Sequence, residues 1–535
     1  MAVTGAWAQE GATPTKDEQK DEPEAQAPKW NLLSIGYYGY DYSGFRRSLR
    51  RYASPPDGLA LKELRLLLPG EGGKAWGRLN LNGTVDHDST GEGLLIFLDG
   101  RATLRGSYAK NEFFDWTPVV VDKSKDREYS ARFTYALTPE IGAYWTYDEK
   151  SRDHKFEGPK DPEDTRTKAY AGGVEGRFLG GQGGVQITDR RFFDRNGSQP
   201  NSIQHRIDAH FGRELIKGIS AEGVYNQTKI EQTGMRDSDV KAIALNADWA
   251  LGEDTYLTFS TRKEDLKMPN VENAYVRQRF STGVRLSSRL AGMAFDGGYQ
   301  HREVERVRGD QTYTDLLNWN TLDAKLSGKV FQRVRWSARY SWDHLSDAAT
   351  MVTLDPRQLY WDDRVKVQAK LDTDCDRFAG YLTYTFRYDQ NSPRSVEVRS
   401  HNLTLGGSYS FSDRTSLFAE MANDTYEAKG VVDTGSSLDD FFPSSTTLAF
   451  GVDHTFNPNQ SISLSVTRYY TRNANPLMLS DGNYNGTEIT AQYRHRLNDN
   501  TSIDVLFAPW RHTDKLEEAL SYRTTVFGVS CSFKF

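Results

Sequence analysis

The sequence predicts an all-β protein, a transmembrane antiparallel β-barrel of about 26 strands with short periplasmic turns and longer extracellular loops. Three observations predict this fold. Apolar and polar residues alternate with a period of two along most of the chain. Short turns and long polar connections follow one another in a regular order. The last segment is an amphipathic strand that ends on an aromatic residue.

The composition excludes helical membrane spans. Only 37% of the 535 residues are apolar, whereas 12% are aromatic. The longest apolar runs, Leu64–Leu68 and Leu94–Leu98, are far shorter than the roughly 18 residues of a transmembrane helix. A barrel wall needs apolar residues only at alternate positions, on its lipid side, so a hydrophilic overall composition is compatible with it. The net charge of −6 and the lack of a basic stripe give no indication of nucleic-acid binding.

The alternation is clearest in four segments, 129–137, 334–342, 365–371 and 461–467. In the first, tyrosine, alanine, phenylalanine, tyrosine and leucine occupy the odd positions, and serine, arginine, threonine and alanine the even ones. This period is typical of strands with one buried face. A soluble sandwich would show the same alternation, so the order of the connections has to distinguish the two folds.

The connections alternate between short and long. Short turns are expected at 138–140, 179–181, 215–217, 331–333, 412–413, 457–459 and 498–500. Long polar loops are expected at 149–167, 191–202, 228–239, 264–275, 304–317, 344–362, 389–399, 427–445, 471–485 and 511–522. Outer-membrane barrels have this asymmetry and sandwiches have no reason to keep it. Ten hairpins between 127 and 510, five upstream strands (31–42, 59–68, 74–86, 92–98 and 101–110) and a last strand at 523–535 give the predicted strand number.

The two ends of the chain carry further expectations. Residues 1–8 resemble the remnant of a signal peptide with an A-x-A cleavage site, and 9–29 are too polar to fold and would lie disordered in the periplasm. The barrel itself is expected over 30–535. The last strand looks like a C-terminal assembly signal of outer-membrane barrels, with one apolar face formed by Phe527, Val529, Cys531, Phe533 and Phe535.

No catalytic, cofactor-binding or metal-binding residues are predicted, and no enzymatic activity. Asp86-His87-Asp88 is interpreted as a solvated loop, and His205 and His210 as part of the lumen wall. The glycine-rich segment 180–184 is interpreted as a turn, since no helix follows it to bind an anion. Cys375 and Cys531 have neither haem-binding nor zinc-binding spacing. A basic cluster in the first loop (Arg46, Arg47, Arg50 and Arg51) could bind lipopolysaccharide phosphate, although a solvated loop is the simpler interpretation.

Charged residues at the polar positions of the strands are predicted to face the lumen, because charges on the lipid face would cost about 2–4 kcal/mol each at the membrane midplane. The predicted lumen-facing residues are Arg132, Arg206, Asp208, Lys325, Arg335, Arg339, Lys366 and Lys370. Both signs of charge are present. Such a wall suits water or the surface of another protein better than the selective pore of an ion channel.

The predicted width carries the functional expectation. Barrels of 16–18 strands leave an aqueous channel and 22-stranded barrels are plugged, so an empty barrel of about 26 strands would be an intolerable hole in an outer membrane. Residues 9–29 are too few to form a plug domain, and no loop is long enough to fold into a large one. We therefore expect another polypeptide to fill the barrel.

The start of the barrel resembles the MtrB/PioB family, the barrel subunits of porin–cytochrome complexes for extracellular electron transfer. The resemblance lies in Gly39-Tyr40-Asp41, Phe45-Arg46, Arg51-Tyr52, Asp57-Gly58-Leu59, Leu64-Arg65-Leu66 and Leu79–Leu81. It implies a sheath around a periplasmic multihaem c-type cytochrome, with haem c in the partner and none in this chain. An extracellular cytochrome and outer-membrane lipids are the further partners it implies. The N-terminal cysteine pair of some members is absent.

Two other classes remain open from the sequence. One is a wide diffusion porin or a polysaccharide-export channel, filled by its own loops or by a periplasmic protein. The other is a barrel that handles lipopolysaccharide or lipid. Many CxxCH motifs in a neighbouring reading frame would favour the electron conduit, and glycan synthases would favour the exporter.

Overall fold

The structure is a computed structural model of the whole chain. It describes residues 31–44, 58–69, 75–84, 89–98, 100–117, 120–157, 163–197, 199–267, 275–307, 314–331, 333–346, 361–392, 395–429, 444–472, 484–515 and 521–535. No helix among these residues is long and apolar enough to cross a membrane. The predicted segments 1–8 and 9–29 lie outside the described residues.

Over the described residues, 26 strands form one antiparallel sheet, in which each strand pairs with the next along the chain. The strands are β1 Leu32–Gly44, β2 Gly58–Pro69, β3 Ala75–Thr84, β4 Ser89–Phe97, β5 Ala102–Thr117, β6 Val120–Ala136, β7 Ile141–Glu157, β8 Glu163–Phe178, β9 Gly181–Asp194, β10 Ser202–Ile216, β11 Ile219–Gln232, β12 Ser238–Gly252, β13 Thr255–Lys267, β14 Tyr275–Leu290, β15 Met293–Val307, β16 Thr314–Val330, β17 Val334–Ser346, β18 Asp363–Cys375, β19 Phe378–Asn391, β20 Val396–Ser412, β21 Thr415–Lys429, β22 Ser444–Asn457, β23 Gln460–Arg472, β24 Tyr484–Arg496, β25 Thr501–Asp514 and β26 Tyr522–Lys534. The fold class and the strand number are those that the sequence predicts.

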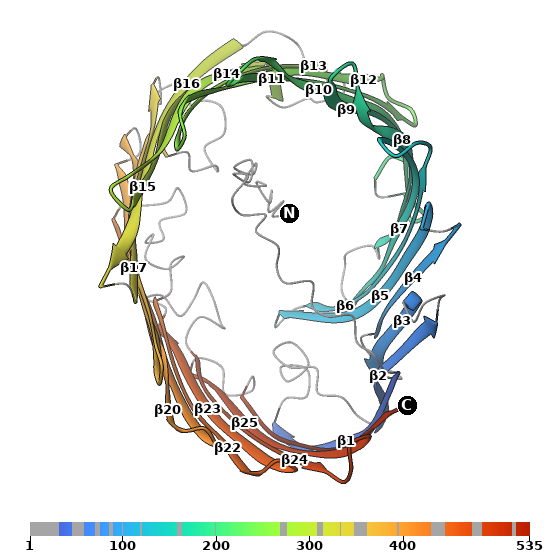
Figure 1. Ribbon diagram of the computed structural model, residues 1–535, viewed down its shortest axis with the longest axis vertical. Helices are drawn as coiled ribbons and strands as arrows, with labels where there is room; N and C mark the ends of the chain where they lie inside the picture. Colours follow the sequence, from blue (N-terminus) through green and yellow to red (C-terminus); the bar gives the residue numbers. More distant parts are fainter. Residues whose placement is uncertain are drawn as a thin grey trace.

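The sheet closes on itself through its first and last strands. β1 pairs with β26 in an unbroken antiparallel register, from Leu32 opposite Lys534 to Gly44 opposite Tyr522. The result is the oval ring of Figure 1, in which the blue β1 and the red C-terminal strands meet at the lower edge. Closure leaves the sheet without the unpaired edge that an open sheet would expose to lipid.

The periplasmic turns are tight, as the sequence predicts. The turn between β8 and β9 is Leu179–Gly180, with φ of 52° at Leu179 and 72° at Gly180. Ala291–Gly292 between β14 and β15 has the same conformation, with φ of 51° and 78°. Positive φ at both central residues matches the twist of the flanking strands, which is why two-residue hairpins favour it. The turns predicted at 215–217 and 331–333 lie where the structure has turns, at 217–218 and 331–333.

The extracellular connections are shorter than predicted, and this expectation was wrong in its bounds. The loop predicted at 149–167 is mostly strand, because β7 continues to Glu157 and β8 begins at Glu163. Likewise, only 233–237 of the predicted loop 228–239 and 392–395 of the predicted loop 389–399 connect strands. The apolar alternation ends where the lipid would end, but the backbone ladder continues above it.

Candidate functional site: the inner wall of the barrel

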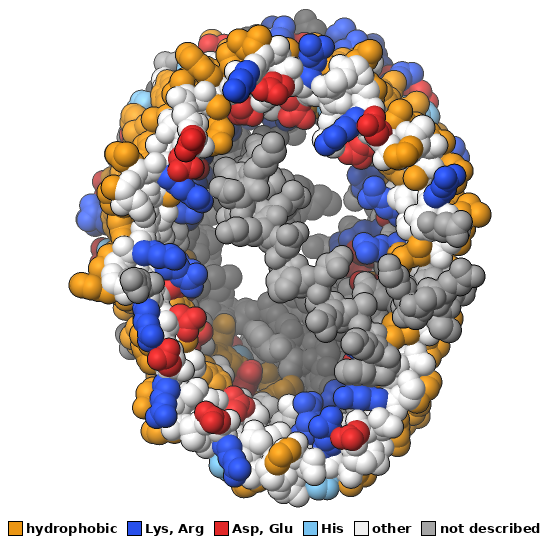
Figure 2. Space-filling view, in the orientation of Figure 1, with side chains coloured by type: hydrophobic (Ala, Val, Ile, Leu, Met, Phe, Trp, Pro, Cys, Tyr) orange, Lys and Arg blue, Asp and Glu red, His pale blue; other side chains and the backbone are white. Residues whose placement is uncertain are grey.

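The two faces of the sheet differ in chemistry. On β9, β10 and β12, Ile187, Ile207 and Ile243 have one parity and are 61%, 41% and 61% exposed, which is the surface a barrel offers to lipid. Arg206 and Asp208 have the other parity. Figure 2 shows hydrophobic side chains around the outer perimeter and charged side chains towards the inside of the ring.

The eight predicted lumen residues all have the parity opposite to that of the exposed apolar side chains on their strands. Arg132 stands between Ala131 and Phe133 of β6, and Arg335 and Arg339 alternate with the exposed apolar row of β17. Lys325 is directly opposite Arg339, and Lys366 and Lys370 are on the neighbouring strand β18. The structure thus gathers five of the eight, Lys325, Arg335, Arg339, Lys366 and Lys370, on β16–β18.

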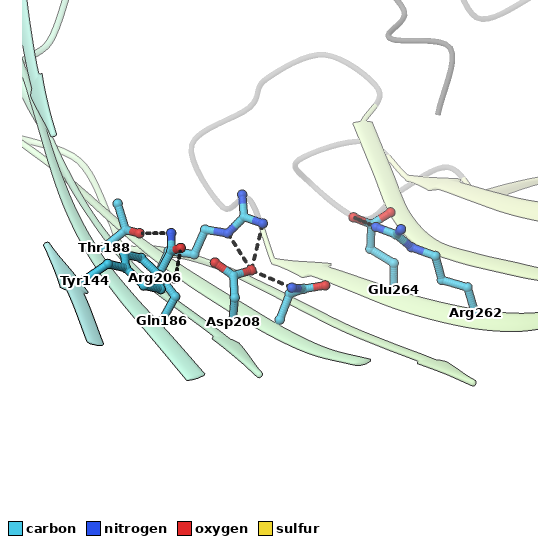
Figure 3. Close-up of polar contacts among 8 residues, drawn as sticks. Tyr144, Gln186, Thr188, Arg206, Asp208, Arg262 and Glu264 are labelled. Atoms are coloured by element: carbon cyan, nitrogen blue, oxygen red, sulfur yellow. Dashed lines mark hydrogen bonds and ion pairs between the residues drawn. The ribbon is translucent and has the colours of Figure 1, made fainter. Parts of the chain in front are cut away.

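Two further sets of hydrogen-bonded side chains lie on β7 and β9 and on β10 and β11 (Figure 3). Arg206 donates from Nε and Nη2 to Asp208 Oδ1 at 2.9 and 2.7 Å, and Asn226 also donates to Asp208. Tyr144 donates from its hydroxyl to Gln186 Oε1 at 2.6 Å, and Gln186 Nε2 donates to Thr188 Oγ1 at 3.0 Å.

Arg132 of β6 adds to the set around Tyr144, because its guanidinium lies 5.1 Å from the centre of the Tyr144 ring. The inner wall here therefore carries two neighbouring polar sets. The charges of Arg206 and Asp208 are paired within the wall.

Asp323 is the centre of another group, on β14–β17. Arg285 Nη2 lies 3.2 Å and Arg339 Nη2 2.9 Å from its carboxylate, and Arg285 also pairs with Asp296. The Asp323 side chain is only 14% exposed, while the two arginines remain 42% and 54% exposed. One carboxylate thus anchors two cations that stay in contact with the lumen.

On the adjacent strands β16, β17 and β18, four inner-wall cations lack such anchors, and we call them the basic strip: Lys325, Lys329, Arg335 and Lys366. None makes an ion pair or side-chain hydrogen bond within the described part of the chain, and all four are exposed. Two cross-strand pairs even place like charges opposite each other, Lys325 with Arg339 and Lys329 with Arg335. Like charges in such pairs repel, so the strip is a surface on which an anionic group would be stabilised. Lys329 and Arg335 flank the 331–333 turn, at the periplasmic end of the wall.

The other residues considered in the sequence analysis do not come together in a site. Phe527, Val529, Phe533 and Phe535 are 50%, 52%, 42% and 63% exposed, and Cys531 shares the strand face of the first three. The lumen-wall interpretation was wrong for His205, which has the outer parity of Ile207 and lies 3.3 Å from Asp189; His210 has the inner parity. Gly180 is in the predicted turn. Residues 86–88 and the cluster Arg46, Arg47, Arg50 and Arg51 lie outside the described residues. Among the described residues, no group of three or more potential ligands could hold a metal ion.

Several wall residues are not predicted from the sequence. The contacts described above also include Tyr144, Gln186, Asn226, Arg285 and Asp296. Their inner parity is readable from the alternation. Their partners are not, because pairing depends on the register between strands, which the sequence pattern defines only to within a few residues.

Comparison with known proteins bears on the fold. No protein-family model and no curated protein sequence matches the chain. The unliganded ferric citrate transporter FecA is similar in structure, with a TM-score of 0.51 and 10% identity over 95% of this chain and 79% of that one. The copper transporter OprC gives a TM-score of 0.51 at 9% identity, covering 94% and 80% of the two chains. A mutant of the ferric enterobactin receptor PfeA from Pseudomonas aeruginosa gives 0.50 at 11%, covering 95% and 80%.

At these identities the likeness concerns the fold alone. With the closed ring, the apolar exterior and the polar interior, it defines the class of the protein. The chain is a large outer-membrane β-barrel of a Gram-negative bacterium, and its architecture resembles that of receptor and transporter barrels.

Proposed function

We propose that this barrel encloses a separately encoded periplasmic multihaem c-type cytochrome, and that the complex carries electrons across the outer membrane. The resemblance of the first barrel strands to the MtrB/PioB family suggests this partner. The single observation that carries the proposal is the width of the ring. The chain itself would hold no haem and catalyse no reaction.

The width follows from the strand number. With strands about 4.8 Å apart and tilted by about 40°, 26 strands enclose a circle about 50 Å across. Side-chain layers of about 5 Å on each side leave an opening of about 40 Å. A folded domain of about 100 residues has a radius of gyration near 13 Å, which corresponds to a diameter of about 35 Å. A small globular protein therefore fits the lumen.

The inner wall supports a protein occupant rather than a lipid one. It carries polar side chains on β7, β9, β10 and β11, where Arg206 and Asp208 are joined to each other and to Asn226. Three residues of the basic strip, Lys325, Lys329 and Arg335, add unanchored positive charge in the periplasmic half of the wall. We infer that the occupant enters from the periplasm and presents acidic side chains or haem propionates to the strip. Such long-range complementarity mainly sets orientation and association rate.

In this proposal the barrel would hold the occupant in a fixed position and separate it from the hydrocarbon of the membrane. The haems of the partner would supply the redox chemistry. The outer face of the barrel keeps lipid away from the occupant, and the inner wall offers it a fixed polar lining in place of hydrocarbon. The extracellular connections would receive an extracellular cytochrome, the second partner that the family resemblance implies.

The test uses the protein purified from its native outer membrane through a tag on this chain. A second polypeptide should co-purify, the absorption spectrum should show a Soret band, and a gel should stain positive for haem. Proteoliposomes with a reduced dye inside should pass electrons to an external oxidant only when both polypeptides are present. A colourless barrel that is alone and conducts ions would contradict the proposal.

The basic strip gives a matched variant. Lys325→Ser/Lys329→Ser/Arg335→Ser should weaken retention of the occupant by about tenfold or more at physiological salt, since several unscreened charge contacts are lost. Lys229→Ser/Lys241→Ser/Lys263→Ser removes three outer-face lysines that already pair with Glu231, Asp239 and Asp265, and should leave retention unchanged. Equal retention in both variants would show that the strip does not contact the occupant.

A wide diffusion porin or polysaccharide-export channel is the second candidate. The exposed mixed charges of the inner wall favour it, because they would also line a water-filled passage. In planar bilayers, such a channel would give large single-channel steps without any second polypeptide. A barrel with its occupant in place should give small steps or none.

A further inference from the structure

A cavity of about 300 Å³ lies against the inner wall at the extracellular ends of β9, β10 and β11. Register places it there, because Arg190 is opposite Gln204, and Phe192 and Gln232 both flank Ser202. These residues have the same parity as Thr188 and Arg206, so the cavity continues the polar surface of Figure 3 towards the outside of the cell. Its lining includes Arg190, Phe192, Gln199, Pro200, Gln204 and Gln232.

One wall of the cavity is formed by Gln199 and Pro200, in the connection between β9 and β10, and a buried carboxylate holds this part of the connection. The Asp194 residue is 6% exposed, and its carboxylate accepts the backbone N–H groups of Asn196 at 3.0 Å and Gln199 at 2.7 Å. The Asn201 side chain accepts the N–H of Asp194 at 2.8 Å. Gln199 and Pro200 are thus held in place before any ligand arrives, which lowers the entropic cost of binding.

The polar side chains that line the cavity are not engaged with the protein. Arg190 and the carboxamides of Gln199, Gln204 and Gln232 make no ion pair or side-chain hydrogen bond over the described residues. Neighbouring arginines behave differently, since Arg191 pairs with Asp189 at 2.8 Å. No carboxylate is among the described residues that line the cavity, and the one cation among them has no counter-charge there.

We infer that this cavity binds a monosaccharide acid, a sugar ring that carries a carboxylate. The guanidinium of Arg190 can take the carboxylate through two parallel hydrogen bonds. The three carboxamides can each donate to and accept from hydroxyl groups, and the faces of Phe192 and Pro200 offer apolar contact to the C–H side of the ring. The volume equals that of about ten water molecules, enough for one such ring. This inference is independent of the proposed cytochrome partner.

The test uses D-galacturonate and D-galactose, which share the ring and differ in the carboxylate. Both are titrated into the complex as purified, by calorimetry and by saturation-transfer NMR. Galacturonate should bind at least tenfold more tightly than galactose. Arg190→Gln should remove this preference, since a charge-assisted hydrogen bond contributes about 10- to 100-fold in affinity. Gln204→Glu should abolish galacturonate binding by giving Arg190 a carboxylate partner directly opposite on β10.

The control is Arg105→Gln, which removes an exposed guanidinium on the inner wall of β5, away from the cavity. It should bind galacturonate as the unmodified chain does. Phe192→Ala should weaken both sugars equally. Equal affinity for the two sugars, unchanged binding by Arg190→Gln, or no galacturonate binding at millimolar concentrations would each overturn the inference. Retention of the haem partner should be the same in all four variants.

Discussion

At the scale of single residues, the inner wall illustrates what alternation can and cannot predict. The parity of Arg206 and Asp208 follows from the apolar neighbours Ile207 and Ala209. That Asp208 also receives Asn226 follows only from the register of β10 with β11. The lack of ion pairs in the basic strip could not be predicted either, because it depends on which side chains lie opposite each cation.

Asp323 provides a residue-scale prediction. Asp323→Asn leaves Arg285 and Arg339 without their shared anion, and the free energy of unfolding should fall by about 1 kcal/mol, as expected for a partly exposed ion pair. Urea unfolding of the barrel in lipid vesicles measures this difference. Asp374→Asn is the control, since the Asp374 carboxylate makes no ion pair within the described residues. Equal losses in both variants would contradict the assigned role of Asp323.

At the scale of strands, the sequence predicts where strands cross the lipid but not where they end. Above the apolar rows, the outer face continues with paired charges such as Lys229 with Glu231 at 2.8 Å and Lys241 with Asp239 at 3.4 Å. Apolar and polar residues do not alternate in these segments, so the sequence predicts loops there. The hydrogen-bonded ladder nevertheless continues through them. For example, Lys229 of β11 is paired with Asp239 of β12. Backbone pairing, and not burial, extends these strands.

The two faces of one strand give the next prediction. Leu245 of β12 is 51% exposed on the outer face, and Asn246 follows it on the inner face. Leu245→Lys should lower the free energy of unfolding in vesicles by about 2–4 kcal/mol, since it places a charge in the lipid near the midplane. Asn246→Lys should change it by less than about 1 kcal/mol, because that side chain faces a polar lumen. A larger loss for Asn246→Lys than for Leu245→Lys would contradict the assignment of the Leu245 face to lipid.

The seam between β1 and β26 depends on a close approach to a glycine. A Cβ on Gly528 would lie 2.3 Å from the Tyr38 ring, so the ring can lie flat against β26 only over a glycine. Gly528→Ala should therefore lower the melting temperature, with a loss of about 1–3 kcal/mol typical of overpacking. Gly252→Ala is the control, since no atom lies within 4 Å of its added Cβ. Heat-modified gel mobility of the folded barrel reports both variants.

At the scale of the whole molecule, the strand number is the property that the sequence predicts best and on which function depends most. The count rests on many hairpins, so errors of a few residues at each strand end do not change it. The proposed occupant would be a separate polypeptide, so what this sequence contributes to the proposal is the width of the ring and the polarity of its wall.

We propose that the ring of 26 strands is too wide to be empty and holds a separate polypeptide. Native mass spectrometry of the protein extracted from its own outer membrane tests it most directly. The account predicts an assembly heavier than this 60.6 kDa chain by one haem-containing polypeptide. A single species at the mass of the chain alone, with nanosiemens conductance in a planar bilayer, would contradict it.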